Sequence, residues 1–144
     1  MNKKGQAAME FIMTYGWAIL VVLVAIAALA YFGVLSPGKY LPEKCVPSAG
    51  IGCSSFKATT TGVDLILQNA LGKDIVVTSI DVADETGCSG TFNTTLINGA
   101  DATFSITCTL TSGAKINSDL NIVYDEVGGL SDLQNSGTLS TKVQ

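Results

Sequence analysis

Residues 11–35 read FIMTYGWAILVVLVAIAALAYFGVL, and this uncharged run decides the architecture of the chain. Its densest part, residues 17–35, is long enough to cross the hydrocarbon core of a bilayer as a helix. Apolar residues occur on every side of the expected helix, so each face has to meet lipid or another helix. Glu10 directly precedes the run and is the only charged residue between Gly5 and Gly38.

Charge ahead of the run sets its expected orientation. Lys3 and Lys4 are the only positive residues before it. Because cytoplasmic flanks carry the excess of lysine and arginine, the N-terminus is expected inside the cell and the bulk of the chain outside.

The chain beyond the run is rich in Thr, Ser, Asn, Asp and Gly, and it contains short β-prone runs separated by turn residues. Seven such runs alternating with turns predict a small antiparallel β-sandwich of the immunoglobulin-like type. The expected strands are residues 56–61, 62–68, 74–82, 90–97, 102–110, 119–125 and 137–144. The fold class is therefore α+β: a long hydrophobic helix followed by a β-sandwich head.

All four cysteines, Cys45, Cys53, Cys88 and Cys108, fall in the part expected outside the cell. An even number of cysteines in that compartment indicates two disulfides, for which three connectivities exist. Zinc binding is disfavoured because the chain has neither a histidine nor a C-x-x-C spacing.

The segment 90–108 reads as a hairpin, and its register selects the disulfide pairing. A three- or five-residue loop places the apolar residues of both arms on one face. In one of these two registers Cys88 lies directly opposite Cys108, which leaves Cys45 to pair with Cys53. The apolar residues used are Phe92, Leu96, Ala102, Phe104 and Ile106.

Asn93 begins the triplet Asn-Thr-Thr, an acceptor sequence for N-glycosylation. It points to the face opposite Phe92 and is therefore expected to be exposed.

Catalytic and metal-binding patterns are missing from the sequence. There is no Ser/His or Cys/His pair, no phosphate-binding glycine loop and no acidic cluster at metal-ligand spacing, so we expect neither an enzyme nor a cofactor or metal. A calcium site built from Asp81, Asp84 and Glu85, or from Asp125 and Glu126, is the alternative. Acidic residues that keep strand ends and turns solvated explain these positions more simply.

Residues 39–144 carry six lysines against eleven acidic residues and no arginine. This acidic balance argues against nucleic acid as a partner.

The N-terminal residues Lys3-Lys4-Gly5, then Gln6 to Phe11, then the apolar run resemble the class III signal peptide of archaeal type IV pilins. In that family a prepilin peptidase cuts after the glycine, which implies cleavage between Gly5 and Gln6. Glu10 would then be the fifth residue of the mature chain, where these pilins place a glutamate.

The resemblance implies that Glu10, with its neighbour Phe11, serves assembly. The glutamate is expected to pair with the new α-amine of a neighbouring subunit, although it also lies one helical turn from the amine of its own chain. The implied partners are further copies of the chain in a helical filament, the prepilin peptidase, the assembly platform and, before assembly, the membrane. The expected location is the cell membrane for the precursor and an extracellular adhesion filament for the mature protein.

The expected organisation is a leader at residues 1–5, a helix at 6–36, a neck loop at 37–53 and the sandwich at 54–144. Two alternatives remain. One is a secreted domain cut after Ala28-Leu29-Ala30, an acceptable signal-peptidase site. The other is a permanently anchored, single-span surface protein that binds a partner or ligand.

Overall fold

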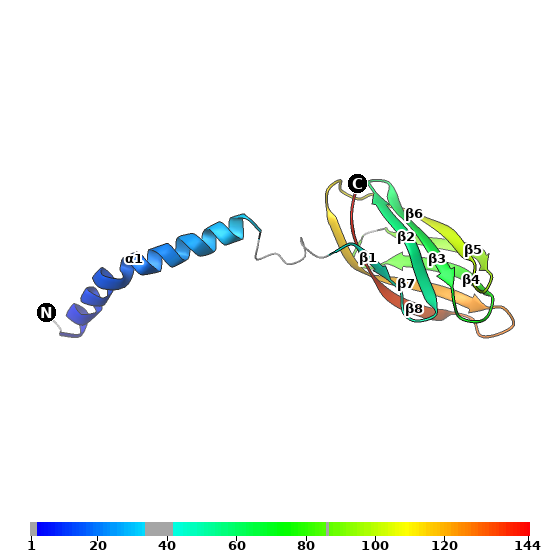
Figure 1. Ribbon diagram of the computed structural model, residues 1–144, viewed down its shortest axis with the longest axis horizontal. Coiled ribbons are helices and arrows are strands. Elements are labelled where there is room, and N and C mark those ends of the chain that lie inside the picture. The colour runs from blue at the N-terminus through cyan, green and yellow to red at the C-terminus, as the bar shows by residue number, and fades with distance from the viewer. Residues whose placement is uncertain (1–2, 34–41, 86) are drawn as a thin grey trace. The chain divides into compact units, whose positions relative to one another are not determined.

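The computed structural model describes residues 3–33, 42–85 and 87–144. The chain divides into two compact units, residues 1–40 and 41–144. The first unit holds the helix α1, Lys3–Tyr31, and the second holds eight strands (Figure 1). This confirms the α+β class. The helix end expected at residue 36 lies outside the described residues.

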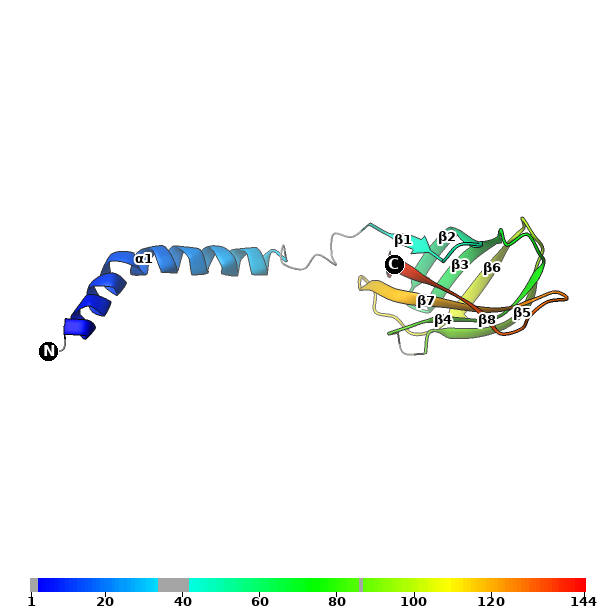
Figure 2. The same cartoon turned by 90° about the horizontal axis from the view of Figure 1, so that it is seen from below.

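Helix α1 has 29 residues, a length of about 43 Å. It bends in its N-terminal part, drawn in the darker blue in Figure 2. In this part the Thr14 hydroxyl donates a hydrogen bond to the Glu10 carbonyl, with an oxygen–oxygen distance of 2.8 Å. A side-chain bond of this kind competes with the backbone ladder and bends helices.

The second unit is a two-layered β-sandwich, seen edge-on in Figure 2. Five strands form one sheet in the order β1-β8-β7-β4-β5, and three form the other in the order β2-β3-β6. Every ladder within the two sheets is antiparallel. The bounds are β1 Lys44–Val46, β2 Ile51–Thr59, β3 Gly62–Asn69, β4 Ile75–Val82, β5 Ser89–Leu96, β6 Asp101–Thr107, β7 Lys115–Glu126 and β8 Leu133–Lys142.

Strands β2 to β8 follow an immunoglobulin-like order. If they are lettered A to G, one sheet is ABE and the other is GFCD. The constant-type immunoglobulin arrangement differs in that its fourth strand pairs with E. The expected immunoglobulin-like sandwich is thus present, with its fourth strand in the opposite sheet.

The core lies between the two sheets and follows from period-two alternation along the strands. In β3, Val63, Leu65 and Leu67 are fully buried, whereas Asp64 and Gln68 are exposed. Phe104 is the largest fully buried side chain, and its ring meets that of Phe92 edge-on, with centroids 5.1 Å apart.

The predicted 90–108 hairpin is wrong, although its apolar residues do face the core. Strand β5 pairs with β4 in the larger sheet, and β6 pairs with β3 in the smaller one. Phe92 and Phe104 therefore meet across the sandwich rather than along one sheet. The alternation of apolar and polar residues identifies the buried face of a strand. It does not show whether two strands belong to one sheet or to two facing sheets, because both arrangements bury the same residues.

The neck loop expected at residues 37–53 is also shorter than predicted. Strand β1 and the start of β2 lie within that range. Strand β1 has only three residues and pairs with the edge of β8, from Lys44 opposite Ser140 to Val46 opposite Thr138. A strand this short carries too little alternation to be recognised in the sequence.

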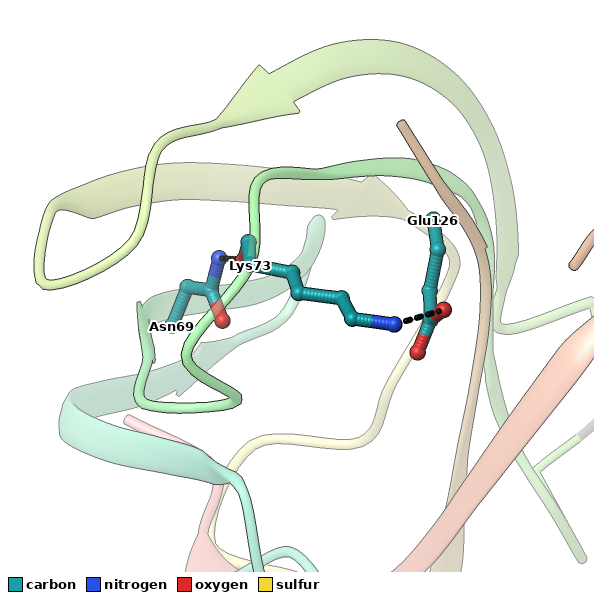
Figure 3. Close-up of polar contacts among 3 residues, drawn as sticks. All are labelled: Asn69, Lys73 and Glu126. Carbon is teal, nitrogen blue, oxygen red and sulfur yellow. Dashed lines mark hydrogen bonds and ion pairs between the residues drawn. The ribbon is translucent and has the colours of Figure 1, made fainter. Parts of the chain in front are cut away.

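The antiparallel topology gathers four loops at one end of the sandwich, which we call the loop end: β1–β2, β3–β4, β5–β6 and β7–β8. The opposite end, where β1 begins and β8 finishes, is called the entry end. At the loop end the buried Asn69 amide donates to the carbonyls of Lys73 and Leu96, at 2.7 and 2.8 Å. Figure 3 shows Asn69 beneath the loop from which Lys73 reaches Glu126.

Candidate functional site

The side chains predicted to serve processing and assembly all lie on α1, and the structure leaves them uncovered. No residue of α1 is buried; Gly16 and Ala18 are partly exposed, and every other residue of α1 is exposed. Within the described residues, α1 is the one helix long and apolar enough to cross a membrane, a property that signal sequences share. Exposing such a helix to water on all sides is unfavourable, so it requires an apolar environment.

The predicted cleavage bond, Gly5–Gln6, lies in the first two turns of α1, next to the exposed Lys3 and Lys4. The first amides of a helix have no intrahelical acceptor, so unwinding this end breaks few hydrogen bonds. A Cβ atom added at Gly5 would meet nothing within 4 Å. Packing within the described chain therefore does not require glycine at position 5.

Glu10 is exposed, and within the described residues its carboxylate has no ion-pair partner. Positions three and four residues away on a helix are the ones whose side chains reach each other. For Glu10 these are Gln6, Ala7, Met13 and Thr14, none of which carries a positive charge. The helical neighbours of Glu10 therefore supply no cation for its carboxylate.

Phe11, next to Glu10, stacks on Tyr15 with ring centroids 4.9 Å apart and an interplanar angle of 40°. Both rings stay more than half exposed. The two rings form a tilted contact on the exposed surface of α1. Their i, i+4 spacing is a sequence signal for this contact, but it was not part of the prediction.

Both disulfides of the β-domain are those predicted. Cys45 is bonded to Cys53, and Cys88 to Cys108. The hairpin from which the Cys88–Cys108 pair was predicted is absent. Cys88 precedes β5 and Cys108 follows β6, so their bond joins segments of two different sheets.

Asn93 is exposed, as expected, and it lies on the edge strand β5. The β4–β5 register shifts between the pairs Val77–Thr94 and Ser79–Thr91, so Phe92 and Asn93 together face Thr78 in a β-bulge. A bulge on an edge strand hinders pairing with another strand and leaves the amide accessible.

Among residues 3–33, 42–85 and 87–144, no group of three or more His, Cys, Asp or Glu side chains is placed to hold a metal ion. The alternative calcium positions, Asp81, Asp84 and Glu85 or Asp125 and Glu126, therefore form no such group there.

The β-domain also exposes apolar side chains that the sequence did not indicate as a surface. Ile97, Val127 and Leu130 are 58–69% exposed and lie in the β5–β6 and β7–β8 loops at the loop end. They look like ordinary loop residues in the sequence, because nothing there shows that the two loops are neighbours.

Comparison of the chain with protein-family models gives no match, and no curated protein matches it in sequence.

Proposed function

We propose that this protein is the subunit of an extracellular filament of the type IV pilus kind, assembled through α1 after cleavage between Gly5 and Gln6 and serving adhesion. The observation that supports the proposal most directly is α1 itself: a helix apolar on every face, with a single carboxylate at its start. In the precursor lipid covers this helix, and in the filament neighbouring helices replace lipid.

Cleavage changes the electrostatics of this segment in two ways. It removes Lys3 and Lys4, which would otherwise be like charges packed together without counter-ions in the filament core. It also creates an α-amine at Gln6. An unpaired acid at bilayer depth costs on the order of 3 kcal/mol, and a cation about 4 Å away returns about 4 kcal/mol at an effective dielectric near 20. Pairing Glu10 with the amine of a neighbouring copy therefore favours entry of the next subunit in one helical register.

N-terminal sequencing of the native protein tests cleavage. We expect the chain to start at Gln6 with its α-amine free; a cyclised residue there would confirm the cut but would leave Glu10 without the proposed cation. A start at Tyr31 would indicate a secreted domain, and a start at Met1 a permanent anchor; either result would overturn the proposal.

Substitution of Glu10 tests assembly. Glu10→Ala and Glu10→Gln should be cleaved and inserted normally but yield few filaments in electron micrographs of cell surfaces. Asp64→Asn, which removes one exposed carboxylate from β3, is the matched control and should assemble like wild type. Normal filament numbers from Glu10→Gln would refute the pairing.

A further inference from the structure

One short segment joins α1 covalently to the β-domain. Residues 43–53, which we call the entry segment, lead from the end of the connecting chain through β1 and the β1–β2 loop into the start of β2. Any tension carried by the chain ahead of residue 43 therefore reaches the β-domain through the entry segment.

Strand β1 is held to the edge of β8 by a short ladder. It has three residues, with Cys45 in the middle and opposite Leu139. One further contact precedes it, because the Lys142 amide donates a hydrogen bond to Glu43 Oε1 at 3.0 Å. An edge strand with so few backbone hydrogen bonds is among the parts of a fold that open locally first.

The β1–β2 loop is fixed to β8 by the buried side chain of Asn135. The Ser48 amide donates to Asn135 Oδ1 at 2.9 Å, and Asn135 Nδ2 donates to the carbonyls of Ser48 and Ala49 at 3.1 and 3.3 Å. The Ser48 hydroxyl donates to the Ser136 carbonyl. The loop and β1 together cover the edge of β8, and their detachment would leave that edge unpaired and open to aggregation.

The Cys45–Cys53 disulfide bypasses this loop. Cys53 lies in β2, a nine-residue strand of the other sheet that pairs with β3 along its length. Tension arriving at Cys45 passes through the disulfide to Cys53, so residues 46–52 carry none of it. The load is then borne by β2 rather than by the three residues of β1. The Cys88–Cys108 bond lies further along the chain and does not protect the entry segment.

We propose that the Cys45–Cys53 disulfide is a load-bearing clasp, which passes tension from α1 directly to β2 and keeps β1 and the β1–β2 loop on β8 while the filament is pulled. The inference rests on the proposed filament function and adds a mechanical role to it. The Cys88–Cys108 bond closes the longer loop and should contribute more to the free energy of unfolding. Resistance to force depends instead on which contacts open first, so under tension the order of the two bonds is reversed.

Optical tweezers on the full chain in detergent test the clasp. Azide-bearing amino acids at Tyr31, the last residue of α1, and at Leu130, in the β7–β8 loop, carry the two handles; both side chains are exposed. The load then runs from the entry segment to the loop end, and no new thiol is introduced. The unaltered chain should unfold without an earlier step.

Cys45→Ala/Cys53→Ala should show an added step at a lower force, before the β-domain unfolds. Eight residues extend to about 28 Å, against 5.9 Å between the two Cα atoms in the folded domain, so this step should lengthen the tether by up to about 22 Å. Cys88→Ala/Cys108→Ala is the matched control and should show no such step. Absence of the step from Cys45→Ala/Cys53→Ala, or its presence in the control, would overturn the proposal.

A further substitution separates the disulfide from the contacts of the loop itself. Asn135→Ala removes the three hydrogen bonds between this side chain and the β1–β2 loop. With the disulfide intact the loop bears no tension, so Asn135→Ala should add no early step. Combined with Cys45→Ala/Cys53→Ala, it should lower the force of the early step. An early step in Asn135→Ala alone would show that the loop carries load and would refute the clasp.

Reduction of the folded, unaltered chain opens the same bond without a substitution. A dithiol reductant transfers two electrons and two protons to the Cys45–Cys53 bond, which becomes two thiols, and is itself oxidised to a disulfide. The partly buried Cys45–Cys53 bond should react before the buried Cys88–Cys108 bond, and alkylation with mass spectrometry identifies the bond opened. Confirmed opening of Cys45–Cys53 without the early step would refute the clasp. Absence of wild-type filaments would refute the proposed function, whereas the pulling measurement decides the clasp separately.

Discussion

The two disulfides should stabilise the β-domain by different amounts, because they close loops of different length. Cys88 and Cys108 are 20 residues apart, and Cys45 and Cys53 are 8 apart. In the chain-entropy description, the bond between Cys88 and Cys108 lowers the entropy of the unfolded chain by an amount worth about 3.3 kcal/mol. The corresponding value for Cys45–Cys53 is about 2.5 kcal/mol.

Burial increases the difference in stabilisation between the two disulfides. Cys88 is 1% exposed and Cys108 is 8% exposed, whereas Cys45 and Cys53 are only partly buried. Replacing the buried pair by alanine also leaves a small cavity, which adds about 1 kcal/mol. Cys88→Ala/Cys108→Ala should therefore lower the free energy of unfolding by about 4 kcal/mol, against about 2.5 kcal/mol for Cys45→Ala/Cys53→Ala.

Urea unfolding of the full chain in detergent measures both losses, with the β-sheet circular dichroism signal as the probe. The urea midpoint should be highest for the unaltered chain, lower for Cys45→Ala/Cys53→Ala and lowest for Cys88→Ala/Cys108→Ala. An equal or larger loss from the Cys45–Cys53 pair would refute the argument from loop length and burial. Removing a cross-link lets the unfolded chain expand and increases the slope, so the two losses are compared as free energies of unfolding extrapolated to zero urea.

Three further substitutions test the β-domain. Asn69→Ala removes three side-chain hydrogen bonds: two that Asn69 donates to the Lys73 and Leu96 carbonyls, and one that it accepts from the Leu71 amide. Because each bond contributes about 1 kcal/mol, the free energy of unfolding should fall by about 3 kcal/mol in the same urea assay. Asn98→Ala is the control, because it removes one exposed hydrogen bond that Asn98 accepts from the Gly72 amide. Its free energy of unfolding should fall by less than about 1 kcal/mol. Equal losses from Asn69→Ala and Asn98→Ala would contradict this reasoning. Asn93→Gln should remove a glycan mass from the native protein in intact-mass spectra and leave stability unchanged, since Asn93 is exposed; an unglycosylated native mass would reject the site.

The residues predicted to serve cleavage and assembly are close to one another in the sequence. The sequence could therefore suggest them without knowledge of the fold. Lys3, Lys4, Gly5 and Glu10 are within eight positions of one another, and helical spacing relates them without any long-range contact. The structure adds that Glu10 has no cation among its helical neighbours and that Gly5 meets no neighbour that would exclude a side chain.

The exposed apolar side chains of the loop end could not be predicted in this way. Ile97, Asp74 and Val127 are separated by more than 20 residues in each case, and they become neighbours only because β5 and β7 both pair with β4. The pairing of β5 with β4 and of β6 with β3 could not be predicted either. Alternation identified Phe92 and Phe104 as core residues but left open the sheet to which each strand belongs.

By itself the sequence determined the elements that depend on local periodicity: the apolar helix, seven of the strands and the inward faces of β3, β5, β6 and β7. Both disulfide pairs were also predicted, although the Cys88–Cys108 bond joins segments of two sheets rather than two arms of a hairpin. Only the tertiary structure decided the strand order, the added strand β1 and the grouping of four loops at the loop end. The physical reason is that burial constrains which side of a strand faces inward, whereas strand partners are selected by the packing of the whole domain.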